Sequence, residues 1–181
     1  MTRLATPARD DAPEASRPLL DAVQRQLGVI PNLYRVIANS PAVLTGFAGF
    51  QGALSKTLDG RTRERIALAV AQVNGCDYCL SAHTYLSLNL ARLSAEEIAL
   101  NRKGASTDAR ANAAVSFAAR VASERGHVDS ADVDAVRAAG FTDAQIVEIV
   151  ALVAENTFTN YLNEVAKTDI DFPVVLAANA A

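Results

Sequence analysis

The chain has 181 residues and a mass of 19.1 kDa, which fits one domain that buries a hydrophobic core without crosslinks. Its 17 basic and 20 acidic residues give a net charge of −3, which argues against a nucleic-acid partner. Two cysteines exclude a disulfide-rich secreted scaffold. Half of the residues are apolar, only 6% are aromatic and alanine is abundant, a composition typical of closely packed helices.

The first fifteen residues differ in character from the rest. Residues 1–15 are polar and contain two prolines, so we expect a flexible N-terminal segment. They include no apolar stretch of the kind that a secretion signal needs, and no later uncharged run suits a membrane span. We therefore expect a soluble cytoplasmic protein without a membrane partner, with residues 16–181 forming one helical domain.

Capping residues, prolines and glycines divide these residues into helices, and no segment alternates as a strand does. Helices are predicted to begin near the following residues: Ser16, Pro31, Pro41, Arg61, Cys76, Ser94, Thr107, Asp129 and Thr142. The helix from about 61 to 74 is apolar nearly all round, which predicts burial. Two predicted capping boxes start at Ser94 and Thr142. The sequence thus predicts an all-α bundle of seven or eight helices, with an extended tail after Pro173.

The only two cysteines form a Cys-x-x-Cys motif, Cys76 and Cys79, followed by His83. On a helix, Cys79 and His83 are four residues apart and share a face. The apolar residues Leu86 and Leu90 extend this face, so we expect it to point inward. The motif is therefore expected at a helix N-terminus, half-buried between two helices.

This position has chemical consequences for a thiol. Unpaired N–H groups and the helix dipole favour thiolate, and a nearby imidazole can take the proton, while Asp77 opposes the thiolate. The two sulfurs can also reach disulfide distance with little rearrangement. The motif can thus cycle between dithiol and disulfide, although these arguments do not choose between Cys76 and Cys79 as the nucleophile.

Two other interpretations of the cysteines stay open. Cys76, Cys79 and His83 supply three zinc ligands, and His127 or Glu64 would be the fourth. Alternatively, the cysteines are buried and inert. By itself, Glu64 is most simply an exposed carboxylate that pairs with a neighbouring arginine.

Several stretches of the chain together resemble a known family, the carboxymuconolactone decarboxylase-like family in its alkylhydroperoxidase D-like, peroxidase-related branch. The similarity covers nearly everything after residue 16. It rests on these segments: Ile30–Arg35, Arg63–Leu68, Asn74–His83 and Asn156–Tyr161.

The resemblance implies a thiol peroxidase whose catalytic residues are Glu64, Cys76, Cys79 and His83. In such enzymes the residue matching Cys79 is oxidised by peroxide, the residue matching Cys76 resolves it to a Cys76–Cys79 disulfide, and the other two relay protons. This chain has Tyr78 where the best-known members have histidine, which implies a shorter relay. Members that decarboxylate a lactone generally lack the cysteine pair.

We therefore expect a hydroperoxide reductase that uses a redox-active Cys76–Cys79 disulfide and is restored by an external dithiol. No metal or other cofactor is expected at the site, and homo-oligomers are common among similar proteins. The alternative is a redox-sensing or zinc-holding interaction module without peroxidase turnover.

Overall fold

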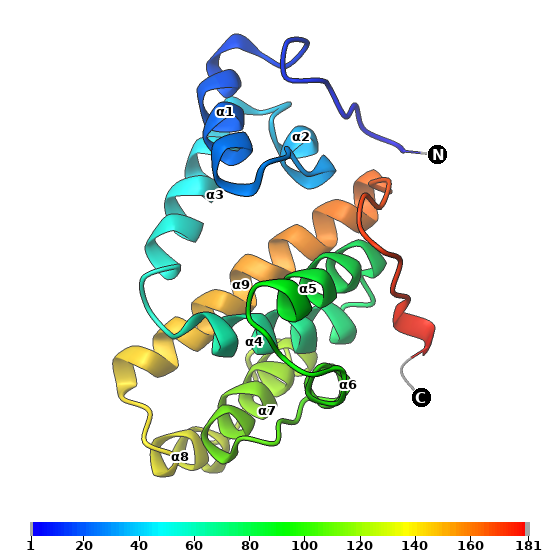
Figure 1. Cartoon of the computed structure of the whole chain (residues 1–181). Helices are drawn as coiled ribbons and strands as arrows, with labels where there is room; N and C mark the ends of the chain where they lie inside the picture. Colours follow the sequence, from blue (N-terminus) through cyan, green and yellow to red (C-terminus); the bar gives the residue numbers. More distant parts are fainter. Residues whose placement is uncertain (1, 180–181) are drawn as a thin grey trace.

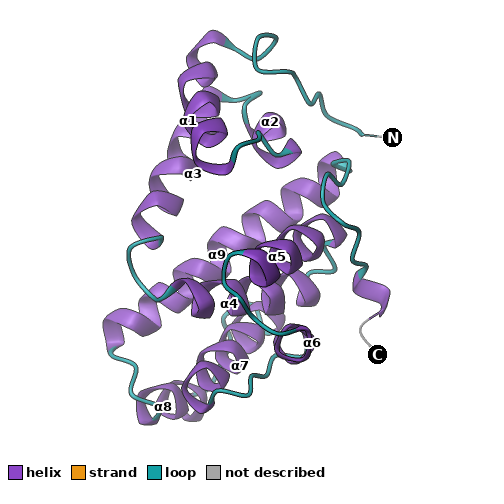
Figure 2. Cartoon of the chain, viewed as in Figure 1, coloured by secondary structure: helices purple, strands orange, loops and turns teal. Residues whose placement is uncertain are grey.

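The computed structural model describes residues 2–179, and this part of the chain is built of helices and loops (Figures 1 and 2). Nine α-helices are present in it: α1 (Arg17–Leu27), α2 (Asn32–Ile37), α3 (Pro41–Leu54), α4 (Gly60–Val73), α5 (Asp77–Asn89), α6 (Ala95–Arg102), α7 (Ala109–Ser123), α8 (Ser130–Ala138) and α9 (Asp143–Ala166). Two short 3-10 turns, Glu14–Ser16 and Ala177–Asn179, lie near the ends. The predicted all-α class is confirmed, and each of the nine predicted starts lies at or within two residues of the start of an α-helix, so the described count is slightly above the predicted total of seven or eight.

Most helix starts use the side-chain caps that the sequence predicts. Ser40 accepts a hydrogen bond from the Val43 N–H, and Thr142 forms its full capping box with Gln145. Ser16 is an exception, because it makes no side-chain cap. Its hydroxyl donates to the carbonyl oxygen of Ala38 at 2.8 Å, which ties the start of α1 to the end of α2.

Helix α4 is the centre of the bundle. It packs against α5, α6, α7 and α9, and every residue from 65 to 71 is buried. Figure 1 shows α5 and α9 crossing over it, with α7 below. The predicted burial of this helix is confirmed, and its alanines allow the neighbouring helices to approach closely.

The buried apolar residues form three clusters. The largest lies among α4, α7, α8 and α9 and includes Ile66 and Ile149. A second joins α4, α5 and α6 around Leu68 and Leu80. The third holds α1, α2 and α3 together around Leu20, and Figure 1 shows these three helices as a group beside the rest. No helix between residues 2 and 179 combines the length and hydropathy that crossing a bilayer requires.

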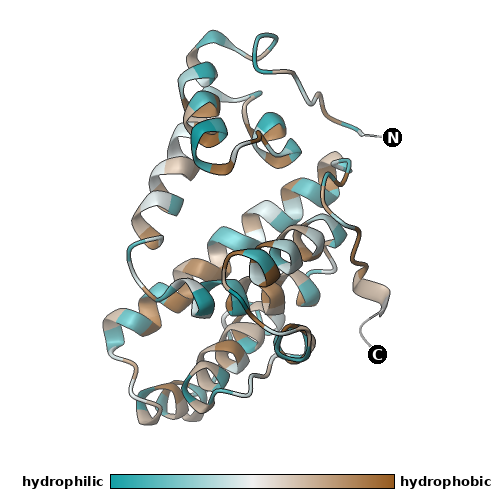
Figure 3. Ribbon diagram, viewed as in Figure 1, coloured by the Kyte–Doolittle hydropathy of each residue, from teal (hydrophilic) through white to brown (hydrophobic). Residues whose placement is uncertain are grey.

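Both ends of the described chain are attached to the bundle by hydrogen bonds. Arg35 donates to the carbonyl oxygens of Thr6 and Pro7, and the Arg3 N–H donates to Ala166. The flexibility expected of residues 1–15 stays a prediction. After Pro173, residues 174–176 have no regular secondary structure and Ala177–Asn179 form a 3-10 turn, so the predicted extended strap is confirmed only in part. The Val175 N–H donates to Ser81 of α5, and Figure 3 shows that the tail is largely hydrophobic.

The predicted capping box at Ser94 is only half formed. Ser94 accepts from the Glu97 N–H, but the Glu97 side chain turns into the protein instead of reaching back. Its carboxylate accepts hydrogen bonds from Arg65 Nε at 2.8 Å and from Asn101, Ser106 and Thr107. Burial opposes ionisation, but these donors hold the pKa of Glu97 well below its usual range.

We predict that Glu97→Ala lowers the free energy of unfolding by about 3–5 kcal/mol, because it leaves Arg65 buried without its ion-pair partner. Urea denaturation at pH 7 measures this, and Glu96→Ala, an exposed neighbour, is the control with little effect. Because the folded pKa of Glu97 is lowered, its contribution is full above the free-glutamate value of 4.5 and is lost as the pH falls below it. Equal stability of the two variants would contradict the prediction.

Candidate functional site

The connection from α4 to α5 places the first cysteine. Gly75 has a φ of +68°, the left-handed region that favours glycine. Its N–H donates to Gln72, and the Cys76 N–H donates to Ala71, the pair of hydrogen bonds that defines a Schellman motif. The motif ends α4 and puts Cys76 at the N-cap of α5, where its sulfur accepts from the Cys79 N–H.

The two thiols lie next to each other at this corner. Cys76 Sγ and Cys79 Sγ are 2.6 Å apart, unbonded, with the Cys76 thiol donating to the Cys79 sulfur. A disulfide bond is about 2.05 Å long, so a small shift of either side chain closes the pair. Cys76 is fully buried and Cys79 is 3% exposed.

Glu64 and His83 meet one turn further along α5. Glu64 comes from α4, and its Oε2 is 2.9 Å from His83 Nδ1. The alternative in which Glu64 pairs with a neighbouring arginine is therefore wrong, because the carboxylate faces α5. Burial lowers the pKa of His83, but the charge and hydrogen bond of Glu64 outweigh it and the net shift is upward.

The hydrogen bond between the thiols makes them unequal. Donation from Cys76 is the largest influence on Cys79, and despite the opposing effect of burial it lowers the pKa of Cys79 to about 7. Asn163, the charge of His83 and Asn160 act in the same direction. The same hydrogen bond, together with burial, raises the pKa of Cys76 strongly. The geometry thus favours a thiolate on Cys79 with Cys76 protonated beside it.

Helix α9 completes the site with amides that sequence reasoning did not assign. Asn163 Nδ2 donates to Cys79 Sγ at 3.3 Å. Asn160 accepts from Asn74 Nδ2 at 2.9 Å, which ties α9 to the turn before the cysteines. The sequence shows these asparagines on one helical face, but this signal alone does not separate a site from a solvated stripe.

A further carboxyl group on α9 lies near the histidine. The pKa of Glu155 is raised by burial, and Glu155 is close enough to His83 for each charge to affect the other. Beside Glu155, an open apolar groove of about 260 Å³ runs between α3 and α9. It is lined by Val43, Gly46, Phe47, Phe50, Ala154, Glu155 and Phe158.

One expectation about α5, concerning Leu90, needs correction. Leu90 does not continue an inward face, since it is 69% exposed at the end of the helix; the buried residues there include Leu80 and Ser87. Tyr78 points away from the proton relay. Its hydroxyl accepts from the Leu33 N–H at 3.1 Å, its ring packs edge-on against Phe172, and burial raises its pKa.

The zinc interpretation lacks a ligand cluster in the part of the chain that the structure describes. There, no three His, Cys, Asp or Glu side chains converge to hold a metal ion. His127, one candidate for a fourth ligand, is exposed in the loop between α7 and α8. The structure brings together Glu64, Cys76, Cys79 and His83, the four residues that the resemblance assigns.

Residues 41–124 match the carboxymuconolactone decarboxylase family model, and this stretch includes all four of these residues. Over these residues the chain is similar to that family. No curated protein matches it. Among solved structures, the alkylhydroperoxidase AhpD core of a peroxidase-related protein from Ralstonia eutropha JMP134 is 28% identical with a TM-score of 0.81, and the alignment covers 94% of this chain and 92% of that one.

Two more solved structures show the breadth of the fold. A peroxidase-related protein from Silicibacter sp. TM1040 is 27% identical with a TM-score of 0.77, covering 93% of this chain and 91% of that one. The debrominase Bmp8 C82A, in complex with 2,3,4-tribromopyrrole, is 20% identical with a TM-score of 0.79, covering 94% and 92%. The alkylhydroperoxidase D-like fold of this chain is thus shown, and the fold also carries other chemistry.

We predict that the reactivity of Cys79 rises with pH to a midpoint near 7, because the thiolate is the reactive form. In Cys76→Ala the donor is gone, so the midpoint moves upward. In Cys76→Ser a hydroxyl can still donate, so the midpoint stays lower than in the alanine variant. The pH dependence of thiol loss to a hydroperoxide measures all three, and identical midpoints for the two variants would contradict the assigned hydrogen bond.

Proposed function

We propose that the chain is a thiol-dependent hydroperoxide reductase in which Cys79 is the nucleophile and Cys76 the resolving thiol. The observation that carries this proposal is the hydrogen bond from Cys76 to Cys79 beside the Glu64–His83 pair. In this arrangement Cys79 is the thiolate, and the sulfur of Cys76 lies 2.6 Å from it, where it can form the disulfide. The similarity to peroxidase-related proteins supports the same chemistry.

In the first step, His83 takes the proton of Cys79, and Glu64 stabilises the imidazolium. The Cys79 thiolate then attacks the terminal oxygen of the hydroperoxide. An S–O bond forms, the O–O bond breaks, and the alkoxide leaves with the proton held by His83, as an alcohol. Cys79 is now a sulfenic acid, so sulfur has been oxidised and peroxide reduced by two electrons.

In the second step, the Cys76 sulfur attacks the sulfenic sulfur of Cys79. The disulfide forms, and the hydroxyl leaves with the Cys76 proton as water. An external dithiol then reduces the disulfide by thiol–disulfide exchange and is itself oxidised. The high pKa of Cys76 keeps its proton available for the departing hydroxyl.

The apolar groove beside Glu155 supports an organic hydroperoxide as substrate. Phe50 and Phe158 are partly exposed along it, and both present apolar surface to a ligand. A hydrocarbon group placed there leaves the peroxide end near Glu155 and His83. We therefore propose that alkyl hydroperoxides react faster than hydrogen peroxide.

We predict that one equivalent of tert-butyl hydroperoxide removes both thiols together and that a dithiol restores them. Thiol titration and intact mass measure this, with a loss of two hydrogens as the signature. Cys79→Ser is expected to keep its remaining thiol. Cys76→Ser is expected to lose one thiol and to gain one oxygen, because the sulfenic acid has no resolving partner.

Other outcomes of the same experiment identify the alternatives. Oxidation that no dithiol reverses indicates a redox sensor, and stoichiometric zinc that protects both thiols indicates a zinc-holding module. Release of bromide from a brominated pyrrole, coupled to thiol loss, indicates the activity named for the debrominase neighbour. Each of these results, without repeated turnover of the hydroperoxide in the presence of a dithiol, contradicts the proposal.

We predict that Glu64→Gln slows oxidation of Cys79 by about 10²-fold, in the range found for general acid–base groups. The loss of the carboxylate lowers the pKa of His83 and weakens its support of the thiolate. Stopped-flow oxidation by tert-butyl hydroperoxide measures the rate, and Glu148→Gln, a partly exposed carboxylate on α9, is the control. An unchanged rate removes Glu64 from the relay.

A further inference from the structure

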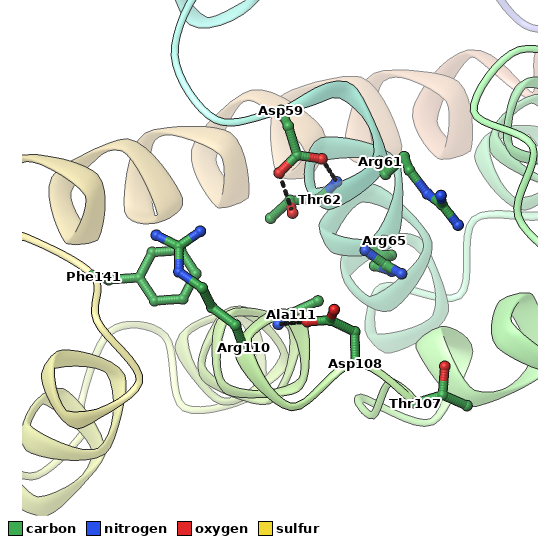
Figure 4. Close-up of a pocket in the computed structure, with 9 residues that line it drawn as sticks. All are labelled: Asp59, Arg61, Thr62, Arg65, Thr107, Asp108, Arg110, Ala111 and Phe141. Atoms are coloured by element: carbon green, nitrogen blue, oxygen red, sulfur yellow. Dashed lines mark hydrogen bonds between the residues drawn. The ribbon is translucent and has the colours of Figure 1, made fainter.

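A second cavity lies on another side of α4, away from the cysteines. Its volume is about 580 Å³, and it opens where the first turns of α4 and α7 meet the loop before α9 (Figure 4). The residues that line it are Asp59, Arg61, Thr62, Arg65, Thr107, Asp108, Arg110, Ala111 and Phe141. Three arginines line this cavity, and the groups that pair with their charges decide what the cavity can bind.

Arg65 is the most buried of the three. Its side chain is 10% exposed and makes one ion pair, from Nε to Glu97. The Glu97 carboxylate is already occupied by donors from Asn101, Ser106 and Thr107. The two terminal nitrogens of Arg65 therefore have no hydrogen-bond acceptor among residues 2–179, and they lie at the cavity (Figure 4).

The other two arginines also lack a carboxylate partner in the described part of the chain. Arg110 lies on the ring of Phe141, with its guanidinium carbon 4.1 Å from the ring centre. Its only hydrogen bonds there are 3.5 Å contacts to Gly140 and Gln145. Arg61 forms no ion pair with the described residues and is exposed at the rim of the cavity.

The two acids in the lining are engaged in capping. Asp59 accepts from the N–H and hydroxyl of Thr62, and Asp108 accepts from the Ala111 N–H. These caps occupy N–H groups at the starts of α4 and α7, so the guanidiniums are the main donors left for a ligand. The three arginines face the two aspartates of the lining and Glu97, the buried ion-pair partner of one of them, so the charges balance and the capacity to bind a ligand lies in the unpartnered guanidinium nitrogens.

We propose that this cavity binds a phosphate group, held by Arg65 and Arg110 with Arg61 at the rim. Guanidinium forks match the oxygens of phosphate, and Arg65 presents two unpartnered nitrogens in a largely buried setting. The cavity is larger than one phosphate ion, so it accommodates either inorganic phosphate or a small phosphate ester. This site is independent of the thiol chemistry.

Isothermal titration with inorganic phosphate tests the proposal, with sodium chloride keeping the ionic strength constant. One saturable site is expected. Arg110→Gln should weaken it about tenfold, the effect of losing one charge-assisted hydrogen bond. Arg65→Lys keeps a positive charge near Glu97 but loses the fork and should weaken binding similarly. Arg25→Gln, an exposed arginine on α1, is the matched control and should not change it.

Titration with glycerol 3-phosphate separates the two sources of the phosphate group. Tighter binding than inorganic phosphate indicates an ester as the ligand, and equal binding indicates the free ion. Absence of a saturable signal with both probes overturns the proposal. Equal binding by the wild type, Arg110→Gln and Arg65→Lys also overturns it, because the arginines then do not hold the ion.

Discussion

The candidate site depends on one hydrogen bond, from the thiol of Cys76 to the sulfur of Cys79. Two thiols in equivalent surroundings would share their protons evenly, and neither would be a good nucleophile at neutral pH. The surroundings of the two thiols differ: Asn163 and the charge of His83 favour a thiolate on Cys79, whereas the N-cap position of Cys76 and its bond from the Cys79 N–H act in the opposite direction, toward a thiolate on Cys76. Side chains of α5 and α9, rather than the backbone alone, thus give two chemically identical groups different roles.

Helix α4 connects this corner to the rest of the bundle. It supplies Glu64 to His83 on one side and Arg65 to Glu97 on another. The residues that follow Arg65 in the helix, Ile66 to Ala71, are apolar and buried, so the helix has little freedom to rotate about its axis. A rotation that moved Glu64 away from His83 would also break the buried Arg65–Glu97 pair. The ion pair therefore helps to set the position of the proton relay, although it does not touch the site.

Local sequence signals predicted most of the fold. Caps such as Ser40 and Thr142 act within one turn of their own helix, so their effect is visible in the sequence. The inward turn of Glu97 was not predictable, because its partner Arg65 is 32 residues away and a capping box satisfies the same pattern. The same reason explains why Asn163 was not assigned: it reaches Cys79 only after α9 packs against α5.

The substitution of Tyr78 changes how the site must work. A histidine at this position would offer a second base, but Tyr78 instead accepts from the Leu33 N–H and packs on Phe172, so it anchors α5 to α2 and to the segment that follows α9. The groups that stabilise the Cys79 thiolate are then Cys76, Asn163 and His83. Two of these are neutral donors that carry no proton away, so in the proposed mechanism His83 and Glu64 are the route by which the proton of Cys79 departs and returns.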